Sequence, residues 1–182
     1  QGIFIAEGEK VVTQLLRSQY RILSSMMPEK YYARLKPLLE SRSEDFDLFL
    51  ASKELLKTLT GYKYYQGVLA VGQIPEKLTL EKAWKMSDSP RFFMAMDELA
   101  NPENVGVIIR NAAAFGVQTV IFGSYCCSPW LRRSVRSSVG NIFNVNIVDG
   151  VDICEAFVWL RSKGMDVVAA HPHAESHVLG NY

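Results

Sequence analysis

Cysteine, histidine and long apolar runs are all scarce in this sequence. The three cysteines, Cys126, Cys127 and Cys154, are odd in number and show no C-x-x-C spacing, which argues against a disulfide framework or a zinc site. No apolar run approaches the roughly 20 residues that span a bilayer, and the first residues lack the basic and apolar regions of a signal peptide. These absences predict a soluble protein of the reducing cytoplasm that makes no membrane contact.

The sequence also has no G-x-G-x-x-G turn followed about 20 residues later by an acidic residue, so a dinucleotide-binding oxidoreductase ranks last among the functions considered. Its composition is ordinary for a globular protein: 182 residues, 48% hydrophobic and 21% charged, are enough for one large or two small cores. A net charge of +1 gives no general prediction of nucleic-acid binding.

Two groups of metal or redox ligands carry only weak signals. His171, His173 and His177 lie in a Pro-containing stretch without a cysteine or a carboxylate pair beside them, so we expect an exposed loop and no metal site. Cys126 and Cys127 are adjacent, a spacing that is awkward to bridge by a disulfide. We expect this pair in a half-buried loop.

Apolar runs of strand length alternate with helical periods over the first 76 residues. The expected strands are residues 3–7, 20–27, 46–52 and 66–74, and the expected helices are residues 9–18, 28–41 and 53–61. The first helix turns four apolar residues inward: Val11, Val12, Leu15 and Leu16. Pro37 is expected to bend or end the second helix, and Gly61 to close the third. This alternation predicts a small α/β domain at residues 1–76.

A charged stretch containing Ser-Asp-Ser and Pro90 comes next, and we interpret residues 77–90 as a linker between two domains. A second alternation occupies residues 91–182. Its expected strands are residues 91–99, 118–124, 144–149 and 165–172, and its expected helices are residues 101–116, 129–143 and 151–164. Four strands with intervening helices predict a parallel, doubly wound sheet, in which ligands bind beyond the carboxyl ends of the strands.

The stretch "NPENVGVIIRNAAAFG" carries polar residues at the start of an otherwise apolar helix. Asn104, Gly106 and Arg110 are expected near the carboxyl end of a strand and near a helix N-terminus, where backbone N–H groups favour an anion. The guanidinium of Arg110 adds a planar fork that suits phosphate. A structural role stays open for all three: Asn104 as N-cap, Gly106 as a close-approach residue, and Arg110 as a solvated partner of Glu103.

The basic residues of the second half are concentrated. Arg110, Arg132, Arg133 and Arg136 lie within 27 residues, which predicts a local positive patch for phosphates or, alternatively, one solvated helix face. Because these arginines are expected at the surface, replacing them by uncharged residues should change the thermal stability little. Tyr64 and Tyr65 beside Gln66 either stack on RNA bases or pack at the edge of the first domain.

Two motifs resemble those of a known family. "NPENVGVIIRNAAAFGV" resembles the first motif of the SpoU/TrmH branch of the SPOUT RNA methyltransferases, N-x-G-x-x-x-R-x-A-x-x-F-G. The matching residues are Asn104, Gly106, Arg110, Ala112, Phe115 and Gly116. The next segment of the family ends in R-x-S-x-G-x-x-F, which is matched by Arg136, Ser138, Gly140 and Phe143. "FIAEGEKVVTQLL" and "YYQGVLAV" resemble the small substrate-binding domain that many members carry first.

The resemblance implies an S-adenosylmethionine-dependent methyltransferase that acts on a ribose 2′-OH of structured RNA, ribosomal RNA more than transfer RNA. It implies a small N-terminal α/β RNA-binding domain, a parallel-sheet α/β knot domain at residues 91–182, and a homodimer that pairs across the motif helices. Arg110 and Asn104 would be catalytic, and Gly106 and Gly140 would shape the motifs. The RNA-binding residues would be Arg132, Arg133, Arg136, Ser138 and Gln66. A non-catalytic RNA-binding protein of the same descent is the alternative.

The sequence departs from the family at its end. Members continue with a G-x-E-x-x-G-type motif and a motif of serine and asparagine, and the knotted backbone of these motifs forms the S-adenosylmethionine pocket. Neither motif occurs before Tyr182. We therefore expect the C-terminal part of the catalytic domain to be missing, the cofactor-binding residues to lie beyond Tyr182, and these 182 residues to be inactive alone.

Overall fold

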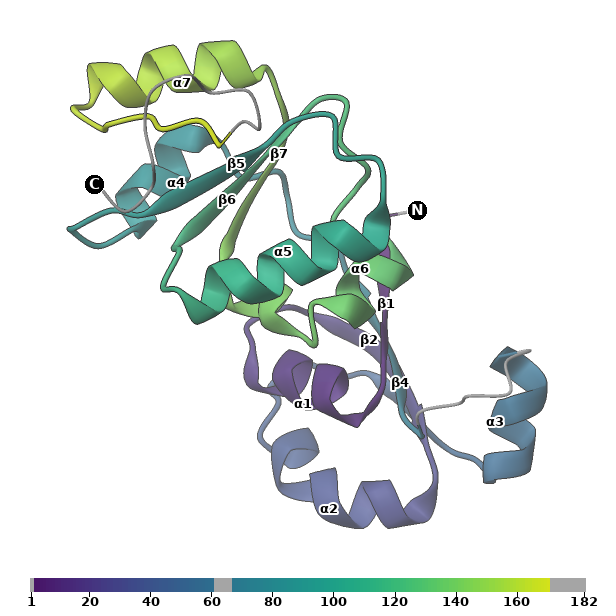
Figure 1. The fold of residues 1–182 in the computed structure, drawn as a ribbon. Helices are drawn as coiled ribbons and strands as arrows, with labels where there is room; N and C mark the ends of the chain where they lie inside the picture. The colour runs from purple at the N-terminus through teal and green to yellow at the C-terminus, as the bar shows by residue number, and fades with distance from the viewer. Residues whose placement is uncertain (1, 61–66, 171–182) are drawn as a thin grey trace.

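The computed structural model describes residues 2–60 and 67–170, which form two α/β units, each built on its own sheet (Figure 1). The elements of the first unit are β1 (Ile3–Glu7), α1 (Glu9–Arg17), β2 (Ile22–Met27), α2 (Glu29–Glu40), β3 (Asp47–Leu50), α3 (Lys53–Thr60) and β4 (Leu69–Gln73). Within the described residues, no helix has the length and apolar character needed to cross a membrane.

The first sheet is mixed, with strand order β1-β4-β2-β3. β4 pairs antiparallel with both β1 and β2, whereas β2 and β3 are parallel. Helix α1 buries the four apolar residues predicted for its inner face: Val11, Val12, Leu15 and Leu16. The prediction of an α/β unit in this half is confirmed.

Pro37 does not end α2. The helix continues to Glu40, three residues beyond the proline, so of the two expected effects the ending is wrong, and a bend stays a prediction. A proline inside a helix leaves the carbonyl four residues earlier without its hydrogen bond. That carbonyl belongs to Ala33, which is exposed and thus open to water, as is Pro37 itself.

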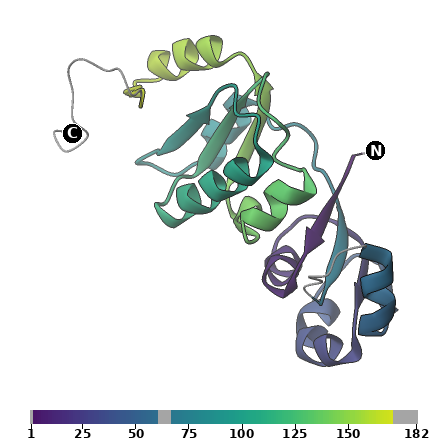
Figure 2. The same cartoon turned by 45° about the vertical axis from the view of Figure 1, so that its right-hand side comes forward.

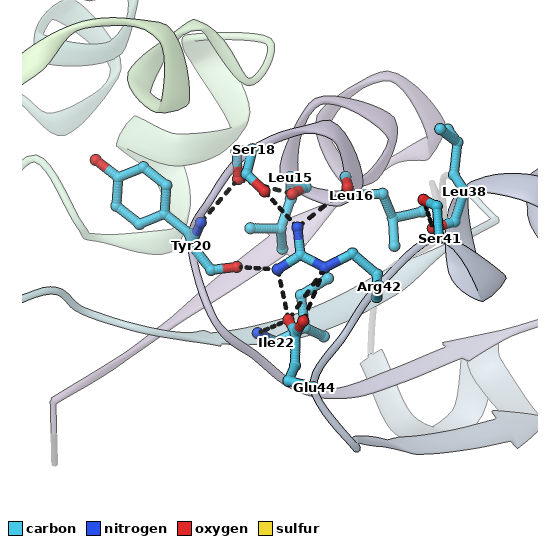
Figure 3. A network of polar contacts seen from close by, with 9 residues as sticks. All are labelled: Leu15, Leu16, Ser18, Tyr20, Ile22, Leu38, Ser41, Arg42 and Glu44. Carbon is cyan, nitrogen blue, oxygen red and sulfur yellow. Dashed lines mark hydrogen bonds and ion pairs between the residues drawn. The ribbon is translucent and has the colours of Figure 1, made fainter.

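A buried arginine ties the loops of the first unit together (Figure 3). The Arg42 guanidinium donates to the carbonyl oxygens of Leu16, Ser18 and Tyr20 and pairs with Glu44, which accepts from the N–H of Ile22 at 3.1 Å. Burial raises the pKa of the Glu44 carboxyl, but hydrogen bonds from Arg42 and from backbone N–H groups outweigh this effect and lower the pKa below its ordinary value. The network closes the C-terminal end of α1 and fixes the start of β2.

The second unit consists of α4 (Leu80–Met86), β5 (Phe93–Met96), α5 (Pro102–Ala114), β6 (Thr119–Gly123), α6 (Arg132–Ser137), the 3₁₀ helix η1 (Asn141–Asn144), β7 (Asn146–Val151) and α7 (Ile153–Ser162). Its sheet has the order β5-β6-β7 and is parallel throughout, as predicted. Helices α5 and α6 cover one face, and α4 and α7 cover the other (Figures 1 and 2). Val120 and Phe122 of β6 pack on the first face and Ile121 on the second, as the alternation of a strand requires.

Two predicted elements of this unit differ from the structure. Residues 129–143 form α6 and η1 rather than one helix, because Val139 and Gly140 take left-handed conformations with φ of 54° and 84°. Residues 165–170 form no strand, so the described part of the sheet has three strands instead of four. An apolar run becomes a strand only where another strand pairs with it, and no described strand pairs with this run.

The stretch expected to be a linker, residues 77–90, contains α4, which packs as part of the second unit. The Thr79 hydroxyl caps the helix by accepting from the N–H of Lys82, and Ala83 is fully buried against the sheet. The Trp84 ring meets Trp159 edge to face, with the ring centroids 5.8 Å apart. We therefore propose that the second unit begins before α4.

The two units share a continuous apolar core. Phe4 of β1 lies with its ring centroid 5.4 Å from that of Trp130 and 5.4 Å from that of Phe143. Tyr20 packs on the same two rings, and burial raises its pKa to about 12. The first unit is thus docked on the segment of the second unit that contains α6 and η1.

Candidate functional site

Helix α5 begins directly after the carboxyl end of β5, and Asn101 fixes where it begins. The Asn101 side chain accepts from the N–H groups of Glu103 and Asn104, at 2.8 and 3.1 Å. Pro102 occupies the first helical position, where its missing N–H costs nothing. Asn104 is therefore not the N-cap, and that alternative is wrong. The Asn-Pro pair in the sequence was the signal for this cap.

Asn104 and Arg110 are both exposed on α5, but they lie at different heights. Asn104 is the third residue of the helix and Arg110 the ninth, which separates them by about 9 Å along the axis. The electrostatic effect of a helix end is confined to its first turn. The expectation that Arg110 lies near the helix N-terminus is therefore wrong, and Arg110 must act through its own charge.

The Arg110 guanidinium has no hydrogen bond or ion pair with any residue that the structure describes. The alternative partner, Glu103, lies on the same helix without forming a salt bridge to it. Two large apolar side chains of this segment are also exposed, Val107 by 45% and Phe115 by 79%. An unpaired planar cation on an exposed helix is suited to bind a phosphate or another oxyanion in two-pronged fashion.

Gly106 is the point of closest approach between α5 and α6. A Cβ atom at this position would lie 2.8 Å from the Ser138 nitrogen and closer still to the Ser134 carbonyl oxygen and the Ser137 hydroxyl. The close-approach alternative for Gly106 is therefore confirmed. The facing side of α6 consists of small residues, of which Ser134 and Ser138 are fully buried.

Two of the three arginines on α6 face the first unit. Arg132 donates from Nε to Glu7 Oε2 at 3.1 Å, and its Nη2 lies 3.0 Å from the same oxygen. Arg136 Nη1 lies 3.9 Å from it. Glu7 is only 1% exposed, whereas Arg133 is exposed. The expected surface patch is thus in part an ion-paired contact between the units, and its contact with RNA stays a prediction.

The remaining sequence-predicted residues fall into three situations. Ser138 is fully buried and donates to the Val135 carbonyl oxygen at 2.8 Å, so direct contact of its side chain with RNA does not fit this position. Gly140 allows α1 to pack closely against this segment, because a Cβ atom at Gly140 would lie 2.7 Å from Cβ of Gln14. Gln66, with Tyr64 and Tyr65, lies outside the described residues, as do the three histidines.

The carboxyl ends of the parallel strands carry two features that the motifs do not include. The Cys126 thiol donates to the Met96 carbonyl oxygen at 3.3 Å, and burial, followed by the neighbouring Cys126, raises the pKa of Cys127. A raised pKa leaves little reactive thiolate at Cys127 at neutral pH. Both cysteines are half-buried in the loop after β6, as expected. Burial also raises the pKa of Asp149 on β7, and Lys77 opposes this effect.

Two hollows of the described residues lie away from this edge. One hollow of about 540 Å³ lies between the C-terminal ends of α1 and α2, and one of about 680 Å³ lies between the start of α1 and α6. Neither borders the carboxyl ends of β5, β6 and β7. We assign no described residue to this cofactor, and the identity of its binding residues stays a prediction.

Arg132→Ala is expected to lower the free energy of unfolding by about 3 kcal/mol, because it leaves the buried Glu7 carboxylate with only the more distant Arg136. This replaces the expectation that charge removal on α6 hardly affects stability. Arg133→Ala is the matched control, since an exposed substitution changes stability by about 0.5 kcal/mol at most. Urea unfolding of both variants measures the difference, and equal midpoints would show that Glu7 does not depend on Arg132.

Comparisons with known proteins agree with this fold and these motifs. Residues 91–180 match the SpoU rRNA Methylase family. The chain is 29% identical over 177 residues to an uncharacterized tRNA/rRNA methyltransferase of Mycobacterium tuberculosis, a match that covers 97% of this chain. The chain spans 59% of the length of that relative.

Two solved structures share the architecture. An RNA 2′-O ribose methyltransferase superposes with a TM-score of 0.74 at 22% identity, covering 97% of this chain and 66% of that one. The SpoU methyltransferase AviRb of Streptomyces viridochromogenes, solved with the cofactor AdoMet, superposes with a TM-score of 0.71 at 20% identity, covering 90% and 61%. The predicted α/β fold of this methyltransferase class is confirmed. The chain therefore carries, over residues 91–180, a domain of the SpoU rRNA Methylase family, whose methyltransferases use S-adenosylmethionine.

Proposed function

We propose that the protein to which this chain belongs methylates a ribose 2′-OH of structured RNA. One observation carries the proposal: the SpoU-type domain presents Arg110 on an exposed face of α5, without a partner among the described residues. The motif that places Arg110 there also places Asn104 on the same helix. In this family, S-adenosylmethionine supplies the methyl group.

The residues of this chain act on the RNA side of the reaction. The 2′-OH must be held in line with the methyl group and must lose its proton. Arg110 is a poor base, because a guanidinium keeps its proton up to a pH of about 12. Its role is to hold a neighbouring phosphate and to stabilise the negative charge that develops on the ribose oxygen. Asn104 orients the ribose or the guanidinium.

Ribosomal RNA is the proposed substrate in preference to transfer RNA. A small domain precedes the methylase domain, and the matching family is named for rRNA methylases. We also propose that two copies pair across α5, where Val107 and Phe115 are exposed, and that the protein acts in the cytoplasm. Of the α6 arginines, Arg133 is exposed and has no ion pair with a described residue, so we propose that it meets RNA phosphates.

Methyl transfer by the full-length protein tests this proposal. With labelled S-adenosylmethionine and ribosomal RNA, we expect label in alkali-resistant dinucleotides, since a 2′-O-methyl group blocks cleavage of the following phosphodiester. Transfer RNA serves as the comparison substrate. The 182-residue chain alone is expected to bind S-adenosylmethionine weakly and to transfer no methyl group, because its sequence lacks the two motifs that form the cofactor pocket in the family it resembles.

Three other results would contradict the proposal. Label in a base would assign a different methyl acceptor. RNA binding by the full-length protein without any transfer would favour a non-catalytic RNA-binding protein of the same descent. Tight binding of S-adenosylmethionine by the 182-residue chain, measured by calorimetry, would contradict the expectation of weak binding and show that the cofactor site lies within this chain.

A further inference from the structure

Glu7 is a buried carboxylate of one unit that contacts two arginines of the other. It ends β1, is 1% exposed, and receives Arg132 through two nitrogens and Arg136 through one. Arg132 opens α6 and Arg136 lies one turn later, so the carboxylate fixes both turns of this short helix. The contact joins residues that are 125 positions apart in the sequence.

The other residues of the R-x-S-x-G-x-x-F motif support the same contact. Gly140 lies against α1, where a Cβ would meet Cα of Val11 at 3.3 Å. The Phe143 ring packs on those of Phe4 and Tyr20, with centroids at 5.4 and 5.3 Å. The motif segment therefore serves as the surface on which the first unit docks, and Glu7 supplies its charged contact.

A hollow of about 680 Å³ lies beside this contact, between the start of α1 and α6. Lys10 lines it from α1, and Arg136 lines it from α6 with 42% of its side chain exposed. Arg132 neutralises Glu7, and Arg34 pairs with Glu9 at the same rim. Lys10 and Arg136 therefore leave the hollow positive, which suits the phosphates of an RNA strand.

We infer that Glu7 is a positioning residue: it holds Arg136 at a fixed distance from Lys10, so that an RNA strand crossing the boundary of the two units meets both cations together. The inference rests on the proposed function for its ligand. It assigns to the contact between the units a role in RNA capture, separate from the action of Arg110 on the ribose. Without the carboxylate, Arg136 samples many orientations, and RNA binding must order it again.

Glu7→Gln in the full-length protein tests the inference. We expect the KM for RNA to rise about tenfold while kcat stays within about twofold, because the loss affects capture rather than chemistry. The Kd for the same RNA, measured without S-adenosylmethionine, should rise by the same factor. Glu7→Asp, which keeps the charge on a shorter side chain, should fall between Glu7→Gln and the wild type. Glu40→Gln is the matched control, since its partner Lys36 lies on the same helix of the first unit and neither residue lines the hollow, and it should behave as wild type.

A second variant keeps the test independent of folding defects. Lys10→Gln alters an exposed residue, so it should weaken RNA binding and reduce its salt dependence without lowering the melting temperature. Unchanged RNA affinity in both Lys10→Gln and Glu7→Gln would overturn the inference, as would equal losses in kcat and kcat/KM for Glu7→Gln. The affinity measurement needs no methyl transfer, so it tests the inference separately from the proposed function. A wild-type protein that binds RNA but transfers no methyl group would contradict only the proposed function.

Discussion

Gly106→Ala is expected to lower the free energy of unfolding by about 2 kcal/mol, although alanine is the better helix former. Forcing a methyl group into a packed contact costs about 3 kcal/mol at the upper end, and the helix propensity of alanine returns about 1 kcal/mol. The upper end applies because the new Cβ would meet the Ser134 carbonyl oxygen and the Ser138 nitrogen, which are backbone atoms of α6. The two helices would have to separate.

Urea unfolding of the 182-residue chain measures this effect. Asn111→Ala, at an exposed position of the same helix, is the control and should change stability by no more than about 0.5 kcal/mol. In Gly106→Ala/Ser137→Gly, only the side-chain part of the clash disappears, so the double variant should recover part of the loss. A single variant more stable than wild type would mean that α5 and α6 do not approach this closely.

A separation of α5 and α6 would also disturb the contacts between the two units. Helix α6 carries Arg132 and Arg136, which pair with Glu7, and η1 follows it with Phe143 in the shared aromatic core. Gly106 therefore links the first motif, on α5, to the docking of the first unit. Loss of RNA affinity in Gly106→Ala is expected to accompany its loss of stability.

The order of most elements was predictable from the sequence because it depends on local periodicity, whereas α4 and the break between α6 and η1 were not predicted. The buried faces of α1 and the strand character of β6 follow directly from the spacing of their apolar residues. The mixed pairing of the first sheet was not predictable in this way. β4 inserts between β1 and β2, and nothing in the local pattern of β4 specifies which strands it joins.

The candidate site was predictable only where a motif encodes it. The spacing of the first motif placed Arg110 on a helix. The distance of Arg110 from the start of that helix became known only when the structure identified Asn101 as the N-cap. The contact between Glu7 and Arg132 depends on the docking of two units, and an arginine cluster alone does not distinguish an RNA-binding face from an ion-paired one. Val139 has a positive φ for which its residue type gives no signal.

Arg110→Ala is expected to reduce methyl transfer by about a thousandfold in the full-length protein, the loss typical of removing a donor that stabilises charge in a transition state. Stability should change by no more than about 0.5 kcal/mol, because the side chain is exposed and has no partner among the described residues. Arg110→Lys should restore little activity. Lysine keeps the charge but loses the planar pair of donors that holds a phosphate and a developing alkoxide in register.

Single-turnover transfer to ribosomal RNA, with saturating S-adenosylmethionine, separates the chemical step from binding, and a melting curve of each variant checks the fold. Arg161→Ala is the matched control, since Arg161 is likewise an exposed arginine of the second unit but lies on α7, on the opposite face of the sheet. Its transfer rate should equal that of the wild type. If Arg110→Ala also turns over at the wild-type rate, Arg110 is a solvated surface residue, and another group stabilises the charge of the ribose oxygen.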